Sequence, residues 1–386
     1  MVKTVASAAM LILVLIIGGR TEASADFAKI SGSMVTIGSK PFFITGINNH
    51  YLTSGTESEV LRVLDDSVAL GATAMRTYLQ PVIGSLDQHV PTIWNWRKLA
   101  DSGNLGVHGS YLLYWDTTAG QMAVNDGPKG MEKVDFLVAE AKKRHLRLII
   151  AFLDFWDYTG GAQQIRAWYG SLDKNTFFFI DPRTKRDYQG WVSYVLDRVN
   201  PRTNVRYKDE PTILAWELMN EGNAEPRELR RAWVAEMSAF IKAKDVNHLV
   251  GSGNANIQVS DLASDLTVPT IDFGVWHGYP KYRRLSVLEF DKLIPRYCDL
   301  ATQYEKPVLL EEFGYARSNQ DQAEAYAKWL DTLAHSHCAG WLVWRLVSRQ
   351  ESGEYPVDEF DQFDIRRDGS PLWNVLKSAT QKAAAP

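Results

Sequence analysis

Short apolar segments alternate with amphipathic segments along most of this chain, and this alternation restricts its fold more than any other feature. Eight of the segments are apolar and bounded by Gly, Pro or polar residues, as expected of parallel strands that are buried on both faces. They cover residues 42–46, 72–78, 147–153, 213–218, 248–252, 271–277, 307–312 and 340–345. Helical periodicity occupies residues 57–70, 130–144, 184–199, 226–245, 288–304 and 321–335, with a short irregular helix at 256–267.

Eight strands that alternate with helices predict a (β/α)8 barrel, the TIM-barrel class of α/β fold. A doubly wound open sheet is the alternative, but the Gly-rich phosphate fingerprint of that fold is missing. Two connections are unusually long, residues 80–126 and 155–181. Both follow strands at the rim where barrel enzymes keep their sites, so we expect long βα loops to form the walls of a substrate cleft.

The N-terminus reads as a secretory signal peptide over residues 1–25. Lys3 supplies a positive start, residues 8–17 are apolar, and Ala23-Ser24-Ala25 offers a small-residue cleavage site. An uncleaved membrane anchor is the alternative, but Gly18-Gly19-Arg20 interrupts the apolar run well before the roughly 20 residues that a membrane span needs. We therefore expect a secreted protein, extracellular or periplasmic, with a single catalytic domain over residues 26–386.

Composition limits the partners of this protein. With a net charge of -4 and 45% hydrophobic residues, the chain can bury one large core and does not suggest a nucleic-acid or membrane partner after cleavage of the signal. The two cysteines, Cys298 and Cys338, leave open both a disulfide and two buried thiols. No zinc or calcium spacing is present, so we expect no metal and no cofactor, and we expect a monomer.

Two carboxylates stand where predicted strands end. Glu221 follows the fourth strand and Glu312 ends the seventh. Glycosidic bond hydrolysis with retention needs one carboxyl to protonate the leaving oxygen and a second, about 5–5.5 Å away, to attack the anomeric carbon. The first role requires a raised pKa, which nearby negative charge and partial desolvation can supply to Glu221. Either glutamate alone could be an exposed loop carboxylate, but two in this barrel order favour catalysis.

The segments around these carboxylates carry a specific resemblance. Trp216-Glu217-Leu218-Met219-Asn220-Glu221 and Glu311-Glu312-Phe313-Gly314 resemble the acid/base and nucleophile motifs of glycoside hydrolase family 5, in the clan A barrel superfamily. Among its branches, the chain is most similar to the endo-β-1,4-mannanases of fungi and plants. The resemblance implies that Glu221 is the acid/base and Glu312 the nucleophile.

The same resemblance implies roles for further side chains. Asn220 would hydrogen-bond the 2-hydroxyl of the reacting sugar, and Arg76 and Tyr279 would contact the nucleophile. His277 would line the site, and Trp344 would form a platform beneath the sugar ring, because a ring face packs against sugar C–H bonds. Structural readings remain open for three of these residues: Arg76 could pair with Glu217 inside the barrel, and His277 and Trp344 could be core residues.

The chain also departs from the mannanase pattern. Asp154-Phe155-Trp156 stands where the family often has Asn-Asn-Trp, so Asp154 and Trp156 are candidate substrate contacts of altered chemistry. Residues 222–225 separate the acid/base from Pro226-Arg227, which usually follows it directly. Strand alternation places Glu311 on the face opposite Glu312 unless the strand end bulges.

These observations predict a secreted retaining glycoside hydrolase that cleaves β-1,4-mannosidic linkages in mannan-type polysaccharides by a two-glutamate double displacement. Its partner would be a β-linked polysaccharide or oligosaccharide. The alternatives within the family are an exo-acting β-mannosidase, a β-glucanase and a transglycosylase. A non-catalytic carbohydrate-binding barrel is the alternative outside the enzymes, and it predicts missing or replaced strand-end acids, whereas both acids are present.

Overall fold

The computed structural model describes residues 26–94, 106–356 and 360–384, so the expected signal peptide lies outside the described residues. Eight parallel strands form one sheet in the order β13-β12-β9-β5-β4-β16-β15-β14. They are β4 (Ile44–Asn48), β5 (Ala74–Tyr78), β9 (Arg147–Ala151), β12 (Ile213–Glu217), β13 (Leu249–Gly251), β14 (Gly274–Gly278), β15 (Val308–Phe313) and β16 (Gly340–Val343). Almost every residue of these strands is buried, as expected when helices cover the outer face of a parallel sheet.

The sheet curls until its two end strands, β13 and β14, face each other. Backbone hydrogen bonds bridge the remaining gap, because the Asp272 amide donates to the Val250 carbonyl at 2.8 Å and the His277 amide donates to the Ala255 carbonyl at 2.8 Å. The eight predicted strands and the predicted (β/α)8 barrel are therefore confirmed.

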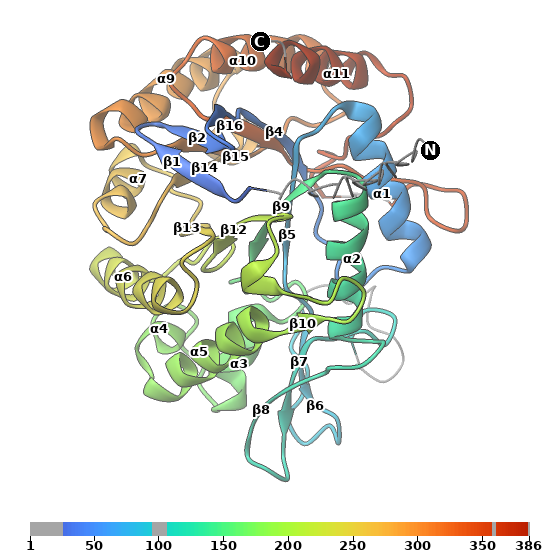
Figure 1. Cartoon of the computed structure of the whole chain (residues 1–386), viewed down its shortest axis with the longest axis vertical. Coiled ribbons are helices and arrows are strands. Elements are labelled where there is room, and N and C mark those ends of the chain that lie inside the picture. Colours follow the sequence, from blue (N-terminus) through green and yellow to red (C-terminus); the bar gives the residue numbers. More distant parts are fainter. Residues whose placement is uncertain (1–25, 95–105, 357–359, 385–386) are drawn as a thin grey trace, which may run out of the picture.

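Helices form a ring around the strands (Figure 1). They are α1 (Glu57–Leu70), α2 (Met131–Lys143), α5 (Pro182–Asp197), α6 (Arg227–Lys244), α7 (Val259–Leu266), α9 (Val287–Tyr304), α10 (Gln322–Ala334) and α11 (Pro371–Ala384). All of the predicted helices are present. Local signals define their ends: α1 begins at a capping box between Thr56 and Glu59 and stops at Gly71, whose φ of 87° suits glycine. None of the described helices is long and apolar enough to cross a membrane.

A small antiparallel sheet precedes the barrel and was not predicted. It consists of β1 (Ala28–Ser31), β2 (Met34–Ile37) and β3 (Lys40–Pro41). Ala28 and Val35 of this sheet join an apolar cluster with barrel-strand residues that include Ile44 and Leu214. This cluster is apolar, whereas the side chains at the carboxyl ends of the same strands are mostly polar.

The two long βα connections contain secondary structure of their own. Residues 80–126 include β6 (Val82–Ser85), β7 (Leu113–Asp116) and β8 (Gln121–Val124), which project beyond the helical ring (Figure 1). Residues 155–181 include α3 (Gly161–Trp168) and α4 (Phe177–Ile180). The Trp168 indole donates to the Ile83 carbonyl at 2.9 Å, which ties the two connections together. The remaining short elements are β10 (Val199–Asn200), β11 (Val205–Arg206), η1 (Tyr207–Asp209) and α8 (Pro280–Arg283).

Cys298 and Cys338 form a disulfide, which decides between the two states left open by the sequence. The bond joins α9 to the residues just before β16. The loop of chain that the bond closes includes β15 and Glu312, whereas Glu221 lies outside it.

Candidate active site

The barrel brings the nine predicted site residues to the carboxyl ends of its strands. Arg76 lies in β5, His277 in β14 and Glu312 in β15. The other six lie within five residues after the end of a strand and are Asp154, Trp156, Asn220, Glu221, Tyr279 and Trp344. This is the rim where (β/α)8 enzymes place their catalytic groups.

Arg76 is fully buried and connects several acidic and amide side chains. Its Nε donates to Oε2 of Glu217 at 2.7 Å, its Nη1 donates to Oε1 of Glu312 at 2.6 Å, and its Nη2 donates to Oδ1 of Asn220 at 3.0 Å. Burial opposes the charged form, but the carboxylates of Glu217 and Glu311 outweigh it and raise the pKa of Arg76 well above its ordinary value. Arg76 therefore makes both of the contacts that the sequence offered as alternatives, the ion pair with Glu217 and the ion pair with Glu312.

Three hydroxyl and guanidinium donors hold the Glu312 carboxylate. Besides Arg76, the hydroxyl of Tyr279 donates to Oε2 at 2.6 Å and the hydroxyl of Tyr78 donates to Oε1 at 2.8 Å. The side chain of Glu312 is only 4% exposed. Sequence reasoning missed Tyr78, although its position two residues after Arg76 on β5 places it on the same face of the strand.

Glu221 has a more open position and a different set of partners. Its Oε1 lies 2.6 Å from Nδ1 of His277, and its Oε2 accepts a hydrogen bond from the indole of Trp156 at 2.7 Å. Its side chain is 21% exposed, and its backbone is left-handed with a φ of 50°. Such a conformation costs a non-glycine residue about 1–3 kcal/mol and is concentrated at functional sites.

The expected rise in the pKa of Glu221 is wrong for this arrangement of side chains. Burial does favour the protonated form, but the hydrogen bond and positive charge of His277, together with the Trp156 indole, outweigh burial. The pKa of Glu221 is consequently lowered from its ordinary value.

His277 bridges the two halves of the site. Its Nδ1 contacts Glu221 and also lies 3.5 Å from Oε2 of Glu312, while its Nε2 lies 3.3 Å from Oε2 of Glu311. Burial lowers the pKa of a histidine, but here the carboxylates of Glu312, Glu221 and Glu311 raise the pKa of His277 to about 10. The imidazole is therefore cationic at neutral pH.

Glu221, His277 and Glu312 bring ligand atoms within 4.8 Å of one another, a spacing that a metal ion could use. A metal requires a neutral imidazole, whereas the pKa of His277 favours the protonated ring. The chemistry of these donors thus fits a charged hydrogen-bond network better than a metal centre, and the absence of a metal stays a prediction.

β15 bulges at Glu311, which is the exception to strand alternation that the sequence left open. Trp276 of β14 pairs with Leu310, but the next residue, His277, pairs with Glu312, so Glu311 is an extra residue in the ladder. The bulge lets the side chains of both Glu311 and Glu312 reach Arg76.

Asp154 lies beside Asn220 and is 3% exposed. Its carboxyl accepts hydrogen bonds from the Asn220 amide at 2.9 Å and from the Trp156 backbone at 3.4 Å. Burial raises the pKa of Asp154 to about 7, and the negative charges of Glu221 and Glu312 add to the effect of burial. The acid that replaces the family's usual amide is therefore poised to titrate near neutral pH.

Trp344 is half-buried and lies next to the Glu312 network. Its ring stacks on Tyr78 with a centroid separation of 6.2 Å and an interplanar angle of 10°. Its backbone amide donates to the Phe313 carbonyl at 2.9 Å.

A second residue that sequence reasoning missed is Asn48. It ends β4, and its side-chain oxygen accepts a hydrogen bond from Nη1 of Arg76 at 3.2 Å. The signal for Asn48 was an amide side chain two residues after the predicted strand at 42–46.

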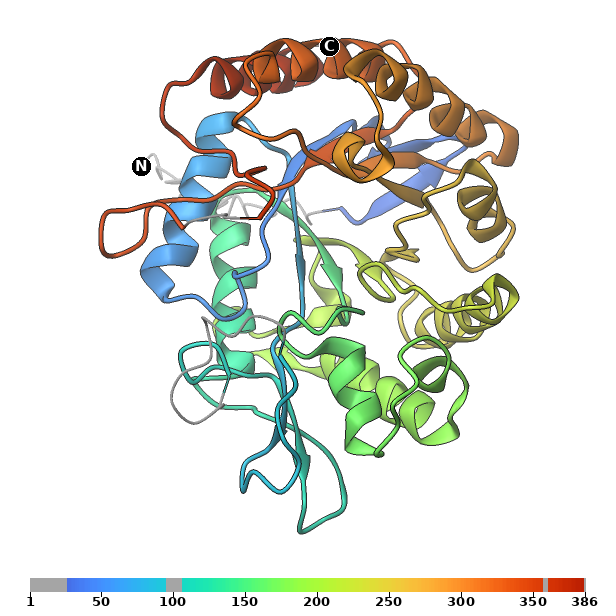
Figure 2. The same ribbon diagram turned by 180° about the vertical axis from the view of Figure 1, so that it is seen from behind.

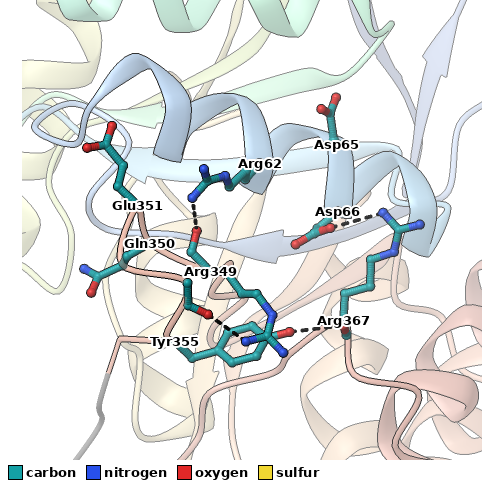
Figure 3. Close-up of a pocket in the computed structure, with 9 residues that line it drawn as sticks. Arg62, Asp65, Asp66, Arg349, Gln350, Glu351, Tyr355 and Arg367 are labelled. Atoms are coloured by element: carbon teal, nitrogen blue, oxygen red, sulfur yellow. Dashed lines mark hydrogen bonds and ion pairs between the residues drawn. The ribbon is translucent and has the colours of Figure 1, made fainter.

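The loop that follows β16 runs beside α1 on the outside of the barrel (Figure 2). A second gathering of charges lies between these two segments (Figure 3). This α1 hollow has a volume of about 480 Å3. Its lining residues are Arg62, Asp65, Asp66, Arg349, Gln350, Glu351, Gly353, Tyr355 and Arg367 (Figure 3). Arg367 pairs with Asp66 at 3.3 Å, and Nη1 of Arg62 donates to the Arg349 carbonyl at 2.9 Å. Asp66 thus has an ion-pair partner in Arg367, and Arg62 has a backbone acceptor.

Comparison with known proteins agrees with this geometry. Residues 25–337 match the glycoside hydrolase family 5 β-mannosidase-like family, so the chain belongs to that family and is a glycosidase. The chain is 26% identical over 357 residues to mannan endo-1,4-β-mannosidase F of Aspergillus fumigatus, an alignment that covers 87% of this chain and 74% of that protein.

Solved structures of two relatives are also similar. The endo-1,4-β-mannanase of Rhizomucor miehei superposes with a TM-score of 0.79 at 24% identity, covering 93% of this chain and 99% of that one. An endo-1,4-β-D-mannanase of Thermotoga petrophila superposes with a TM-score of 0.75 at 26% identity, covering 88% of this chain and 100% of that one. The resemblance noted in the motifs therefore extends through the whole barrel.

Proposed function

We propose that this protein is a secreted retaining glycoside hydrolase that cleaves internal β-1,4-mannosidic linkages, with Glu312 as nucleophile and Glu221 as acid/base. The observation that carries the proposal is the close approach of the two carboxyl groups, which have oxygens within 4.8 Å of each other. Retaining glycosidases separate their carboxyl groups by about 5–5.5 Å, whereas inverting enzymes leave about 6.5–9.5 Å for a water molecule. The spacing therefore favours direct attack by a carboxylate.

In the first step, Glu312 attacks the anomeric carbon while Glu221 protonates the leaving oxygen, and a glycosyl ester forms on Glu312. In the second step, Glu221 takes a proton from water, which attacks the same carbon and releases Glu312. The donors on Glu312 fix the direction of its attack, and the more exposed position of Glu221 suits a group that exchanges protons with leaving group and water.

The neighbouring side chains would bind the sugar at the point of cleavage. The Asn220 amide has two hydrogens, and the one not given to Asp154 can reach a substrate 2-hydroxyl. Trp344 would pack against the sugar ring, since it is half-buried beside the nucleophile network. Asp154 and Trp156 would contact the sugar from the end of β9, where the family pattern is altered.

Secretion and a single catalytic domain over residues 26–386 are part of the same proposal. The signal-like sequence of residues 1–25 supports export. The Cys298–Cys338 disulfide adds support, because disulfides persist in oxidising compartments. A β-linked polysaccharide is the proposed partner, and the enzyme is expected to act as a monomer without metal or cofactor.

The test is the product pattern from a series of manno-oligosaccharides, run beside mannan, glucomannan and cellulose. A mixture of short oligomers is expected, because internal cleavage leaves fragments of several lengths. Release of mannose alone would instead indicate an exo-acting β-mannosidase, and longer products would indicate transglycosylation. Activity on cellulose with none on mannan would reject the mannan assignment. A chelator should leave the rate unchanged, since no metal takes part in the proposed steps.

A further inference from the structure

A second pair of carboxyl groups, Glu217 and Glu311, lies behind the catalytic candidates and takes no part in the reaction steps above. Both side chains are 0% exposed, and the two carboxyl groups lie within hydrogen-bonding reach of each other. Acidic side chains are rarely buried so completely without a partner, and two ionised carboxylates at this separation repel.

The contacts of this pair are unequal. Oε2 of Glu217 lies 2.7 Å from Nε of Arg76, and Oε2 of Glu311 lies 3.2 Å from the same nitrogen. Oε2 of Glu311 has a second cationic neighbour, Nε2 of His277, at 3.3 Å. Within the described part of the chain, Oε1 of Glu217 and Oε1 of Glu311 are buried and meet no donor. One proton shared between the two carboxyl groups would remove one of the two negative charges and add a hydrogen bond between groups that each have an oxygen without a donor.

We propose that Glu217 and Glu311 share one proton, carried by Glu217, and act as a positioning pair that orients Arg76 and His277 toward the catalytic carboxylates. Among the described residues, Glu311 contacts two cations and Glu217 contacts one, so Glu311 is the carboxyl that stays ionised. The inference rests on the proposed glycosidase function, which supplies the reaction that the pair would serve.

The electrostatics of the surrounding groups agree with this assignment. Burial raises the pKa of Glu217 well above its ordinary value, and the nearby charge of Glu311 adds to that rise. Burial also acts on Glu311, but there Arg76 and His277 outweigh it and lower the pKa. In the described chain, the cations that contact the pair come from β5 (Arg76) and β14 (His277), and the Asn48 amide donates to the Glu311 backbone carbonyl.

The same two cations reach the catalytic groups with their other nitrogens. Nη1 of Arg76 donates to Glu312 at 2.6 Å, and Nδ1 of His277 lies 2.6 Å from Glu221. The positioning pair therefore contacts Nε of Arg76 and Nε2 of His277. The remaining nitrogens of the same two side chains contact the candidate catalytic carboxyl groups. A shift of about 1 Å in such a group can cost about 100-fold in rate.

Two glutamine variants test the proposal because they are not equivalent. In Glu217→Gln the amide reproduces a protonated acid: its oxygen accepts from Arg76 and its N–H donates to Glu311. We expect kcat to fall by less than about tenfold, with the titration of His277 unchanged. In Glu311→Gln the ionised partner of His277 is lost, so we expect the pKa of His277 to fall and kcat to drop by about 100-fold with little change in KM.

The readouts are steady-state kinetics, NMR titration of His277 and infrared spectroscopy at pH 9, well above the pKa of about 7 of Asp154. The wild type should show the C=O band of a buried protonated carboxylic acid, and Glu217→Gln should lack it. The proposal is overturned if Glu217→Gln leaves that band in place, or if it loses as much kcat as Glu311→Gln. It is also overturned if Glu311→Gln leaves the His277 titration where it was.

Should Glu311→Gln fail to fold, Glu217→Gln still decides the question through its infrared band and its kcat. The outcome is also separable from that of the proposed function. A wild type without activity on any β-mannoside would reject the proposed function, while the infrared and NMR measurements would still report whether Glu217 and Glu311 share a proton.

Discussion

The barrel mouth, which is the candidate active site around Arg76, and the α1 hollow both contain arginine side chains next to carboxylates. The two regions differ in how deeply these side chains are buried. In the barrel mouth the side chains of Arg76 and Glu217 are 0% exposed. In the α1 hollow the side chains of Arg367 and Asp66 are 54% and 16% exposed. An exposed pair contributes little because water solvates each charge, whereas breaking a buried pair leaves a charge uncompensated. Burial, rather than the number of charges, therefore distinguishes the candidate active site from the α1 hollow.

The largest expected effect concerns Glu312, the proposed nucleophile. Glu312→Gln keeps the shape of the side chain but removes the attacking carboxylate, so kcat on manno-oligosaccharides should fall at least about 10⁴-fold. Initial-rate kinetics measure the loss, and Asp66→Asn in the α1 hollow is the matched control, with an unchanged rate expected. Near-normal turnover by the Glu312→Gln enzyme would contradict the assignment of Glu312 as the nucleophile.

Arg76→Lys should rank next. Lysine keeps the charge but lacks the planar fork that reaches Glu217, Glu312 and Asn220 together, so some of these buried acceptors lose their donor. The expected cost is about 3–5 kcal/mol of folding free energy, together with a large fall in kcat. Denaturant unfolding and kinetics measure the two effects, with Arg367→Lys as the control. Equal losses of folding free energy in Arg76→Lys and Arg367→Lys would contradict the claim that burial makes the Arg76 contacts more important than those of Arg367.

Asp154→Asn should change how stability depends on pH. The pKa of Asp154 is about 7 in the folded protein, against about 3.9 in an unfolded chain. Protonation of Asp154 therefore stabilises the fold fully below the unfolded pKa, and this stabilisation is lost as the pH rises through about 7. Thermal unfolding between pH 4 and 8 should show a smaller decline in Tm for the variant. Parallel Tm curves for both proteins would show that Asp154 does not titrate as described.

Trp156→Phe should move the pH profile with a modest loss of rate. The indole hydrogen bond helps to lower the pKa of Glu221, so its removal raises that pKa. Glu221 must be protonated for the first step, and kcat/KM falls as the pH rises through its pKa. The alkaline limb of the kcat/KM profile should therefore shift to higher pH in the variant. A shift to lower pH would reverse the electrostatic role assigned to the indole.

The smallest effect belongs to the α1 hollow. Arg367→Ala removes a half-exposed partner of Asp66 and should cost at most about 1 kcal/mol, with kcat unchanged. Unfolding in low and high salt measures this contribution, which should shrink further as salt screens the pair. A loss of activity in this variant would mean that the hollow, too, takes part in function.

The barrel itself could be predicted from the sequence because its strands are buried on both faces and its helices carry an apolar stripe. The first strand was placed two residues early, since the half-buried Phe42 and Phe43 extend the apolar run before Ile44. The β1–β3 and β6–β8 sheets escaped prediction. They are short and exposed in part, so their residues carry a weaker pattern than the barrel strands.

The site residues could be named from motifs, but their mutual contacts could not. The bulge that turns Glu311 inward arises from the pairing of β14 with β15, which no local pattern reveals. The direction of the Glu221 pKa shift depends on His277 and Trp156, which are distant in sequence. Tyr78 and Asn48 were missed because they stand outside the acidic motifs, although both contact Arg76.

The central claim is that Glu312 attacks the sugar directly, and trapping the covalent intermediate tests it. A 2-deoxy-2-fluoro-β-mannoside with a good leaving group should form an ester that hydrolyses slowly, and mass spectrometry of the digested protein can locate it. We expect a single 2-deoxy-2-fluoromannosyl group on Glu312. An adduct on Glu221 or Glu311, or turnover of the reagent by an enzyme that never carries an adduct, would contradict it.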